Sequence, residues 1–291
     1  MAFAPPVSSP LSGGASTVYL LNPEVVLRVP RADLEHSASF ERERLVISLA
    51  RQAGVRTPAL LAFGTLPWAP GKPYMLLERV HGVNLGQLGR PPGELPDTYR
   101  ELGRDLARWH LRAAHEHDGL ALLPRDEHPD PRVGLEALAE EGYLPSEMAE
   151  WLGAWLDRLA PQTAQPLVWR VVHGDARPTN VLVSERSGLY RALLDWGDAA
   201  WADPASEFAL LPLRAVPFAL EGYRELRPGV EAEVSEVRVL WYHLGWAVHA
   251  LRRERSTERT WSAPPVGRLL ELLRFFVGDV PPAWRTLRPP L

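Results

Sequence analysis

The sequence predicts an α+β protein with a small N-terminal sheet lobe followed by a larger, mainly helical lobe. Short β-rich runs dominate the first 80 residues, helical periodicity dominates after residue 82, and 46% of the 291 residues are hydrophobic. A chain of this length has ample apolar surface to bury in one large domain or in two lobes. We expect lobes at residues 1–80 and 81–291, with a hinge at about residues 78–82.

The first lobe is predicted to contain two strand pairs and one helix. Residues 17–30 contain two β-rich runs separated by turn residues. Apolar residues at helical spacing predict a helix from about residue 37 to residue 53, which a glycine and a proline then end. Residues 59–66 and 73–80 form the second predicted strand pair.

The second lobe is predicted to be mainly helical, with three short apolar strands in its middle. Its helices are expected around residues 102–109 and 148–159 and at residues 232–253 and 266–277, and its strands at residues 168–172, 181–183 and 189–194. The last two strands are separated by a short turn, so they can form a hairpin.

The composition excludes several classes of protein. The chain has no cysteine, which excludes a disulfide scaffold, a cysteine-ligated zinc site and a thiol nucleophile. Its formal net charge of −4 argues against a general nucleic-acid binder. No apolar run reaches the ~20 residues of a membrane span, and the N-terminus has no signal-peptide pattern. We expect a cytoplasmic protein with no membrane or nucleic-acid partner.

Three polar residues near the predicted hairpin carry the strongest chemical signal. Asp175 precedes Asn180 by five residues, and Asp195 follows Asp175 by 20 residues at the end of an apolar strand. Polar residues at the ends of two paired strands can converge at one point. Two carboxylates and a carboxamide suit a hard cation such as Mg²⁺, which prefers oxygen ligands. One carboxylate can then accept a proton from a hydroxyl while the other holds metal.

This spacing is that of the protein-kinase catalytic loop, with Asp and Asn five residues apart, followed by an Asp-x-Gly metal site. Gly174, where protein kinases have arginine, resembles instead the aminoglycoside phosphotransferase and choline kinase-like family. The Asp-Trp and Gly-Asp-Pro-like segments of that family correspond to Asp195-Trp196-Gly197 and Ala202-Asp203-Pro204. The resemblance covers nearly the whole chain and implies a bilobal protein-kinase-like fold.

The resemblance also implies a function. It implies an ATP-dependent kinase that transfers the γ-phosphoryl group to a hydroxyl of a small-molecule acceptor, with GTP left open as the donor. Asp175 is then the catalytic base, and Asn180 and Asp195 are the Mg²⁺ ligands. The sequence leaves the acceptor undetermined. A nucleotide-binding pseudokinase with a regulatory role is the alternative, and a metal-dependent phosphoesterase is disfavoured because the histidines are not grouped with carboxylates at ligand spacing.

The first lobe supplies the candidate phosphate-binding cation. Arg28 stands where the kinase motif has lysine, and strand alternation puts it on the same face as Val26. Arginine keeps the positive charge but presents a longer, planar head. Glu43 is the expected partner of Arg28 by its resemblance to the family pattern, although helical periodicity alone leaves Glu41 nearly as good a choice.

The remaining nucleotide contacts are expected at a loop and at the hinge. The loop at residues 11–17 contains two glycines followed by hydroxyl residues, and Ser16 and Thr17 are its candidate phosphate-binding residues. At the hinge, the backbone carbonyl of Glu78 and the N–H of Val80 are expected to bind adenine. Lys72, the only lysine, lies in a proline- and glycine-containing loop and is expected to play no part.

Several histidines and tryptophans are better explained by structure than by chemistry. His110 follows a tryptophan in a predicted helix and is expected in the core. His115 and His117 are two residues apart, a spacing that does not share a helix face, so a metal site there is not expected. Trp241 and Trp246 could line an acceptor pocket, but the core is the favoured interpretation.

Overall fold

The computed structural model describes residues 11–12, 16–31, 34–67, 69, 71–113, 119–163, 168–252, 262 and 264–290. The glycines of the predicted phosphate loop, His115 and His117 lie outside these residues. The chain divides into two compact units. The first unit comprises residues 1–89, 105–124 and 171–201, and the second comprises residues 90–104, 125–170 and 202–291. Each unit takes in three segments, whereas the predicted lobes divide the chain once, at residues 78–82; that boundary stays a prediction.

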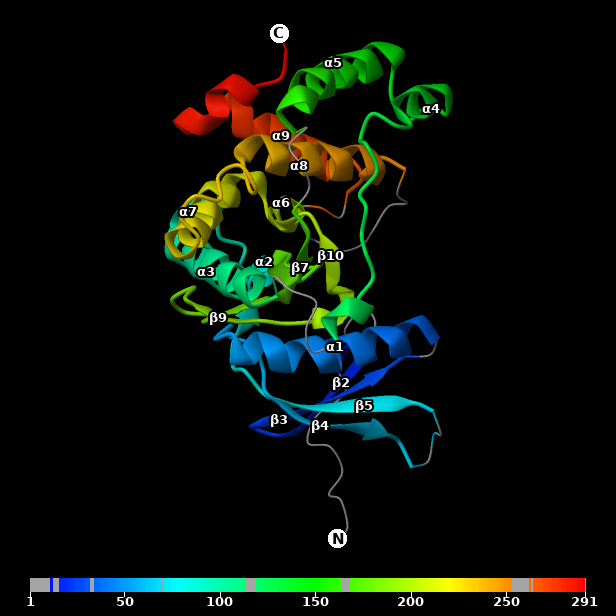
Figure 1. Ribbon diagram of the computed structural model, residues 1–291, viewed down its shortest axis with the longest axis vertical. Coiled ribbons are helices and arrows are strands. Elements are labelled where there is room, and N and C mark those ends of the chain that lie inside the picture. Colours follow the sequence, from blue (N-terminus) through cyan, green and yellow to red (C-terminus); the bar gives the residue numbers. More distant parts are fainter. Residues whose placement is uncertain are drawn as a thin grey trace. The chain divides into compact units, whose positions relative to one another are not determined.

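An antiparallel five-stranded sheet and one long helix open the first unit. The strands are β1 (Leu11–Ser12), β2 (Ser16–Asn22), β3 (Val25–Pro30), β4 (Leu60–Thr65) and β5 (Pro73–Glu78), in the order β1-β2-β3-β5-β4. Helix α1 (Leu34–Gln52) packs on the sheet, as Figure 1 shows. Phe40 and Ile47 of the helix and Met75 of β5 are buried. Both predicted strand pairs and the predicted helix are confirmed.

A three-stranded sheet in the same unit contains the predicted hairpin. Its strands are β6 (Val83–Asn84), β8 (Val181–Val183) and β9 (Tyr190–Leu193), in the order β6-β8-β9. Val181 pairs with Leu193, and the backbone N–H of Leu194 donates to the Asn180 carbonyl at 2.8 Å. The hairpin therefore places the residue before β8 beside the residues that follow β9, as the sequence predicted.

Short elements complete the first unit and the segments that link it to the second. They are strands β7 (Arg170–Val172) and β10 (Ala200–Ala202), which pair with each other, helix α2 (Leu85–Leu88), and the 3₁₀ helices η1 (Pro92–Glu94), η2 (Leu120–Leu122), η3 (Pro178–Asn180) and η4 (Trp196–Asp198). The sequence predicted β7 but not β10. The 3₁₀ helices η3 and η4 each follow a strand end that carries polar residues, so they shape the candidate site.

Helices make up the second unit. They are α4 (Leu135–Glu140), α5 (Ser146–Thr163), α6 (Pro204–Phe208), α7 (Val216–Leu226), α8 (Glu236–Ala250) and α9 (Gly267–Val277), with the 3₁₀ helices η5 (Leu213–Ala215) and η6 (Pro282–Leu287), while α3 (Pro96–Arg112) begins here and continues into the first unit. Helices α3, α5, α8 and α9 were predicted. Within the described chain, no helix combines the length and apolarity needed to span a bilayer.

Helices α3 and α7 approach each other at two glycines. A Cβ atom on Gly103 would lie 1.9 Å from the Ala219 carbonyl oxygen, and one on Gly222 would lie 2.0 Å from that of Arg100. The two backbones are therefore in contact, which no other residue type permits at either position. Exposed ion pairs flank the crossing, including Arg104 with Glu225 at 2.7 Å.

Candidate active site

The loop that carries Asp175 depends on the glycine before it. Gly174 has a φ of +82°, and a Cβ atom there would lie 2.1 Å from the backbone oxygen of Asp198. Both the positive φ and this close approach require glycine. The loop after β7 is therefore pressed against the segment after β9, which explains physically why arginine cannot occupy position 174 in this chain.

His173 ties the same loop to the end of β9. The ring is fully buried, its Nε2 lies 2.9 Å from the Leu194 carbonyl oxygen, and its Nδ1 accepts the backbone N–H of Asp175 at 3.1 Å. A carbonyl can only accept, so Nε2 carries the proton and Nδ1 is the acceptor. His173 thus fixes the backbone of Asp175 and has no free nitrogen for proton transfer.

Asp175 is held by two neighbours within its own loop. The side-chain amide nitrogen of Asn180 donates to Asp175 Oδ2 at 2.7 Å and to its backbone carbonyl at 2.9 Å, while Arg177 Nε donates to Oδ1. The pKa of Asp175 is raised to about 7, mainly because the carboxylate is withdrawn from water. The charge of Arg177 opposes this rise, and the nearby carboxylate of Asp198 adds to it. A carboxylate poised near neutrality is well matched to accept a proton in catalysis.

Asp195 adopts an unusual backbone conformation next to Asn180. Its φ of 67° and ψ of 73° make it the one non-glycine residue with positive φ among those that the structure describes. Such a conformation costs on the order of 1–3 kcal/mol and is found preferentially at functional sites. The Asp195 side chain is 44% exposed, so it points a carboxylate toward solvent at the end of the hairpin.

Trp196 and Gly197 hold Asp195 in place. Trp196 is fully buried, donates from Nε1 to Thr57 Oγ1 at 2.9 Å, and packs against the rings of Trp109 and His173. A Cβ atom on Gly197 would lie 2.0 Å from Ser39 Oγ, so η4 packs directly against α1. The motif residues after Asp195 are therefore anchors that bring its carboxylate to the helix carrying Glu43.

Arg28 is the centre of a charged cluster on β3. Its Nη1 donates to Glu43 Oε1 at 2.5 Å, its Nη2 to Asp195 Oδ1 at 3.1 Å, and its Nε to Ser16 Oγ at 3.3 Å. Glu43 is almost completely buried, whereas Glu41 is 57% exposed and pairs with Arg44. The structure therefore brings Arg28 to Glu43 and not to Glu41.

Burial and charge oppose each other in this cluster. Burial by itself lowers the pKa of Arg28, but Glu43 and Asp195 raise it, and the net effect is a raised pKa that keeps the guanidinium charged. Burial raises the pKa of Glu43, and the charge of Arg28 opposes that rise. One arginine thus faces two carboxylates, which leaves an excess of negative potential at the exposed Asp195.

The donor atoms here fit a magnesium ion. Asn180 uses its amide nitrogen on Asp175, so its oxygen remains for a ligand beside the exposed carboxylate of Asp195. Within the described residues, no group of three histidine, aspartate or glutamate side chains is arranged to hold a metal by itself. Mg²⁺ in nucleotide enzymes takes one or two protein oxygens and completes its shell with phosphates and water. A pair of protein ligands therefore suffices for that ion.

The other predicted nucleotide residues lie on the first sheet. Thr17 pairs with Val29, one position along β3 from Arg28. The Glu78 carboxylate accepts the Ala59 N–H at 3.0 Å and pairs with Arg51 at 3.1 Å, while Val80 follows the end of β5. The side chain of Glu78 is thus used within the sheet, and the backbone contacts to adenine expected at residues 78 and 80 stay predictions.

Sequence reasoning missed two charged residues beside Asp175. Arg177 contacts the carboxylate directly, and Asp198 acts on it through its charge. Their signal in the sequence was proximity, since Arg177 lies inside the catalytic-loop motif and Asp198 directly follows Asp195-Trp196-Gly197. As predicted, Lys72 lies in the loop between β4 and β5, where its Nζ donates to the Arg31 carbonyl at 3.1 Å.

Asp203, in the Gly-Asp-Pro-like stretch, has a structural role in the second unit. Its Oδ1 accepts the Ala205 N–H at 2.9 Å and so caps α6. Its Oδ2 accepts from Tyr242 at 2.7 Å and from Arg238.

Two predictions about the burial of aromatic side chains remain, of which one is confirmed and one is wrong. His110 is fully buried on α3, as expected. Trp241 and Trp246, for which the core was favoured, are instead half-buried and line a cavity in the second unit. Both lie on α8, and helical periodicity alone does not reveal which side of a helix faces a cavity rather than solid core.

The fold and this loop are of the protein-kinase-like class. The sequence model of the phosphotransferase enzyme family matches residues 8–233. Because that match covers most of the chain, the protein belongs to this family. The predicted family and fold class are confirmed.

Solved structures support the same fold. The GDP complex of wild-type aminoglycoside 2'-phosphotransferase-IIIa is 21% identical, with a TM-score of 0.62 over 84% of this chain and 85% of that chain. The GDP and kanamycin complex of that type of enzyme is 20% identical, with a TM-score of 0.62 over 86% of this chain and 88% of the other. A choline/ethanolamine kinase family protein from Mesorhizobium loti is 17% identical, with a TM-score of 0.54 over 85% and 80%.

A curated relative adds a similarity in sequence. The uncharacterized protein YcbJ of Bacillus subtilis is 26% identical over 195 residues, which cover 64% of this chain. The match spans 61% of the length of YcbJ, less than two thirds of that protein.

Proposed function

We propose that this protein is a kinase that transfers the γ-phosphoryl group of ATP to a hydroxyl of a small acceptor, with Asp175 as its base. The observation that carries the proposal is the Asp175 carboxylate, which is only 13% exposed, is held by Asn180 and Arg177, and has its pKa raised to about 7 by desolvation. GTP is the second donor to test, because two of the similar structures are GDP complexes. An ATP-consuming enzyme works where ATP is present, so a cytoplasmic location belongs to the same proposal.

In the proposed reaction, the acceptor oxygen forms a bond to the γ-phosphorus as the bond from that phosphorus to the β–γ bridging oxygen breaks. The products are a phosphate ester and ADP, and the hydroxyl proton passes to Asp175. Asn180 and Arg177 fix the rotation of the carboxylate, so the proton-accepting lone pair is already oriented before the acceptor binds. Catalysis of this kind depends mainly on positioning and on charge stabilisation.

Asn180 and Asp195 would hold Mg²⁺, which neutralises phosphate charge when bound. Arg28 would bind an α- or β-phosphate oxygen, and Glu43 would hold the guanidinium in place. Asp195 uses Oδ1 for Arg28 within the described residues, so its second oxygen is the one that faces a cation. The exposed end of the cluster therefore combines a positive group for phosphate with an oxygen ligand for metal.

The alternative of a nucleotide-binding pseudokinase is disfavoured by this arrangement. A protein that only binds nucleotide has no use for an oriented base, and Asn180 and Arg177 hold the Asp175 carboxylate in one orientation. Asn180 also contacts Asp175, and Arg28 contacts both Glu43 and Asp195.

The substitution Asp175→Asn tests the proposal. Loss of the base should lower turnover by roughly 10²–10⁴-fold while nucleotide affinity changes by no more than a few-fold, because Asp175 touches the acceptor and not the nucleotide. ADP release with ATP or GTP and a panel of hydroxylated acceptors gives the rate, and calorimetry gives the affinity. Asp97→Asn, at a 77% exposed carboxylate on α3, is the control. An equal loss of binding and turnover would show that Asp175 is structural or a metal ligand.

A further inference from the structure

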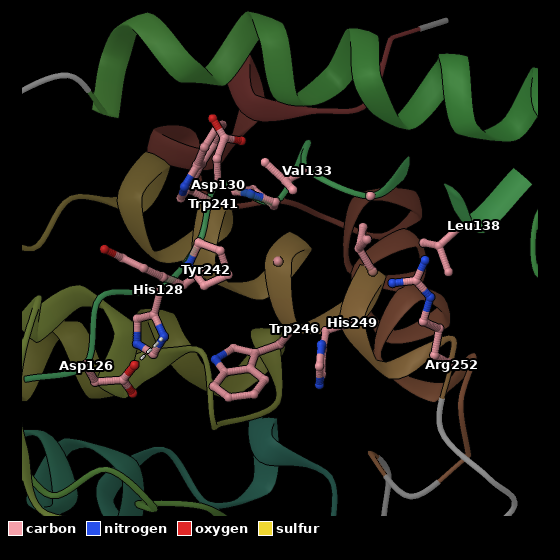
Figure 2. Close-up of a pocket in the computed structure, with 15 residues that line it drawn as sticks. Asp126, His128, Asp130, Val133, Leu138, Trp241, Tyr242, Trp246, His249 and Arg252 are labelled. Carbon is pink, nitrogen blue, oxygen red and sulfur yellow. Dashed lines mark ion pairs between the residues drawn. The ribbon is translucent and has the colours of Figure 1, made fainter. Parts of the chain in front are cut away.

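The second unit contains a cavity that the proposed chemistry does not use. Its volume is about 310 Å³, and it lies between α8 and the loop at residues 126–134 (Figure 2). Small-molecule sites of this size are usually lined by aromatic side chains with a few polar groups that orient the ligand. Here the aromatic side chains come from α8 and the acidic ones from the loop.

The aromatic wall is held in place before any ligand binds. Figure 2 shows Trp241, Tyr242 and Trp246 of α8 together with His128 of the loop. The His128 ring packs edge-on against Tyr242, with centroids 5.1 Å apart, and against Trp246 at 5.8 Å. The Tyr242 hydroxyl donates to Asp203, so this residue offers the cavity mainly its ring. The wall is therefore a rigid apolar surface that suits a flat ligand.

Both tryptophans already have a cation against them. The guanidinium carbon of Arg132 lies 5.6 Å from the Trp241 ring centroid, and that of Arg268 lies 5.8 Å from the Trp246 ring centroid. Both distances are within the range of cation–π attraction. A second cation on the same rings would be repelled by these arginines, so the tryptophans select an uncharged flat group.

The charged side chains of the lining are mostly neutralised by partners. Asp130 accepts from the backbone N–H and from Nε of Arg132 at 2.9 and 3.0 Å, and Arg132 holds the pKa of Asp130 below its usual range. Arg252 is held by Glu141 at 2.9 Å. These charges are therefore already balanced and offer little to a ligand.

Asp126 is different from the other charged residues of the lining. Its carboxylate is 54% exposed, and its neighbour is the His128 ring, whose Nδ1 lies 3.5 Å from Asp126 Oδ1. Figure 2 shows this pair at the edge of the cavity beside Trp246. An exposed carboxylate that no arginine or lysine pairs with among the described residues, next to an aromatic surface, suits one protonated amine attached to a flat body.

We propose that this cavity binds an arylalkylamine-like molecule, with its single cationic amine at Asp126 and its flat body against Trp246 and Trp241. The cavity does not suit a polycationic aminosugar such as kanamycin, because among the described residues several amines would meet one available carboxylate and three arginines nearby. The role of this molecule as the phosphoryl acceptor rests on the proposed function; its binding does not.

Binding is tested by calorimetry on the full chain with matched pairs of probes. The amines are tyramine, tryptamine and 2-phenylethylamine, and each is paired with the alcohol of the same skeleton, which lacks the charge. Concentrations up to about 10 mM cover a weak millimolar complex. We expect at least one amine to bind about tenfold or more tightly than its alcohol, since a charged hydrogen bond is lost in the alcohol, and kanamycin to bind more weakly than that amine. Absence of binding by all three amines, or equal affinity within every pair, overturns the proposal.

Two variants locate the binding. Asp126→Asn should weaken the amine roughly tenfold or more and leave its alcohol within about twofold, whereas Asp97→Asn on α3 should change neither. Trp246→Leu should weaken amine and alcohol together. Asp126 is exposed, so its substitution is compatible with folding even where Trp246→Leu is not. Unchanged amine affinity in Asp126→Asn shows that the amine binds elsewhere and overturns the proposal.

The acceptor role is tested separately by ADP release with ATP and tyramine, which carries a hydroxyl. If the amines bind as expected but no acceptor yields ADP, the cavity stands and the proposed phosphotransfer fails. If another acceptor is phosphorylated while none of the amines binds, the phosphotransfer stands and the cavity proposal fails.

Discussion

Glu43 and Asp105 are both buried carboxylates of the first unit that pair with arginine, but their surroundings differ. Asp105 is fully buried and accepts from the backbone N–H, Nε and Nη2 of Arg56 at 3.0, 3.1 and 3.2 Å, and also from Arg108. Two arginines therefore serve one carboxylate. At Glu43 the balance is reversed, because Arg28 is shared between Glu43 and the exposed Asp195.

This difference shows what distinguishes a candidate site from a structural ion cluster. Burial and close pairing are common to both, so neither marks function. The Arg28 cluster adds a carboxylate that solvent can reach, a strained backbone at that carboxylate, and fewer arginines than acids. In the Asp105 cluster, both carboxylate oxygens accept hydrogen bonds, and these bonds connect helix α3 to Arg56. The following substitutions test whether the two clusters differ in this way.

Among the substitutions that compare the two clusters, Arg28→Ala should have the largest effect on catalysis. Loss of a preorganised cation is expected to lower kcat/KM for ATP by roughly 10²–10³-fold, with both a higher KM and a lower kcat. Arg28→Lys should recover part of the loss, because a point charge can still reach a phosphate oxygen. Steady-state kinetics at saturating acceptor measures both parameters. A fully active Arg28→Ala enzyme would mean that this cluster is structural like the other one.

Asp105→Asn should act on stability instead of catalysis. Removing one charge from a buried ion cluster costs about 3 kcal/mol in unfolding free energy, the lower end of the usual range, because Arg56 and Arg108 are each about one-third exposed and can rehydrate. Urea denaturation measures the change, and KM for ATP should match that of the parent protein below the transition. A large shift in KM with unaltered denaturation would contradict the structural assignment.

Asp195→Asn should weaken Mg²⁺-dependent nucleotide binding by at least about tenfold. Substitutions of residues that only support a metal's ligands already lower metal affinity by about this factor, so loss of a ligand should lower it at least as much. Asparagine is the informative choice because it tolerates positive φ, whereas alanine would add backbone strain. Metal-free nucleotide binding should survive. Calorimetric titration of nucleotide with and without Mg²⁺ measures both affinities, and an identical Mg²⁺ effect in parent and variant would rule out the metal role.

Lys72→Ala should have the smallest effect. Its ammonium donates to one backbone carbonyl in a loop. The unfolding free energy should therefore change by less than about 0.5 kcal/mol, and KM and kcat by no more than the corresponding factor of about two. The same kinetic and urea measurements apply. A crippled Lys72→Ala enzyme combined with a normal Arg28→Ala enzyme would show that the wrong cation has been assigned to phosphate.

The parts of the site that follow from local spacing could be predicted from the sequence. Asp175 and Asn180 lie five residues apart, and the apolar strands around them form the expected hairpin, so their convergence with Asp195 is a consequence of short-range geometry. The phosphotransferase family and the fold class follow from the same motif, and the family match and the similar structures confirm them. The catalytic and metal roles of these residues stay predictions.

The rest could not be predicted because it depends on long-range packing. The choice between Glu43 and Glu41 depends on how α1 is rotated toward β3, which periodicity left nearly even. The Asp105 cluster joins residues 49 positions apart and has no motif. Trp241 and Trp246 differ from core residues only because the loop at residues 126–134 leaves a space against α8.

Lys72 also makes the protein unusually simple to label. The chain has one lysine and no cysteine, so the α-amine of the chain is the one other primary amine that an acylating reagent meets. A free α-amine has a pKa near 8, so it can be blocked first near neutral pH and the lysine modified in a second step. A fluorophore or surface tether attached in this way sits in the β4–β5 loop, and any cysteine introduced elsewhere becomes a second, independent attachment point.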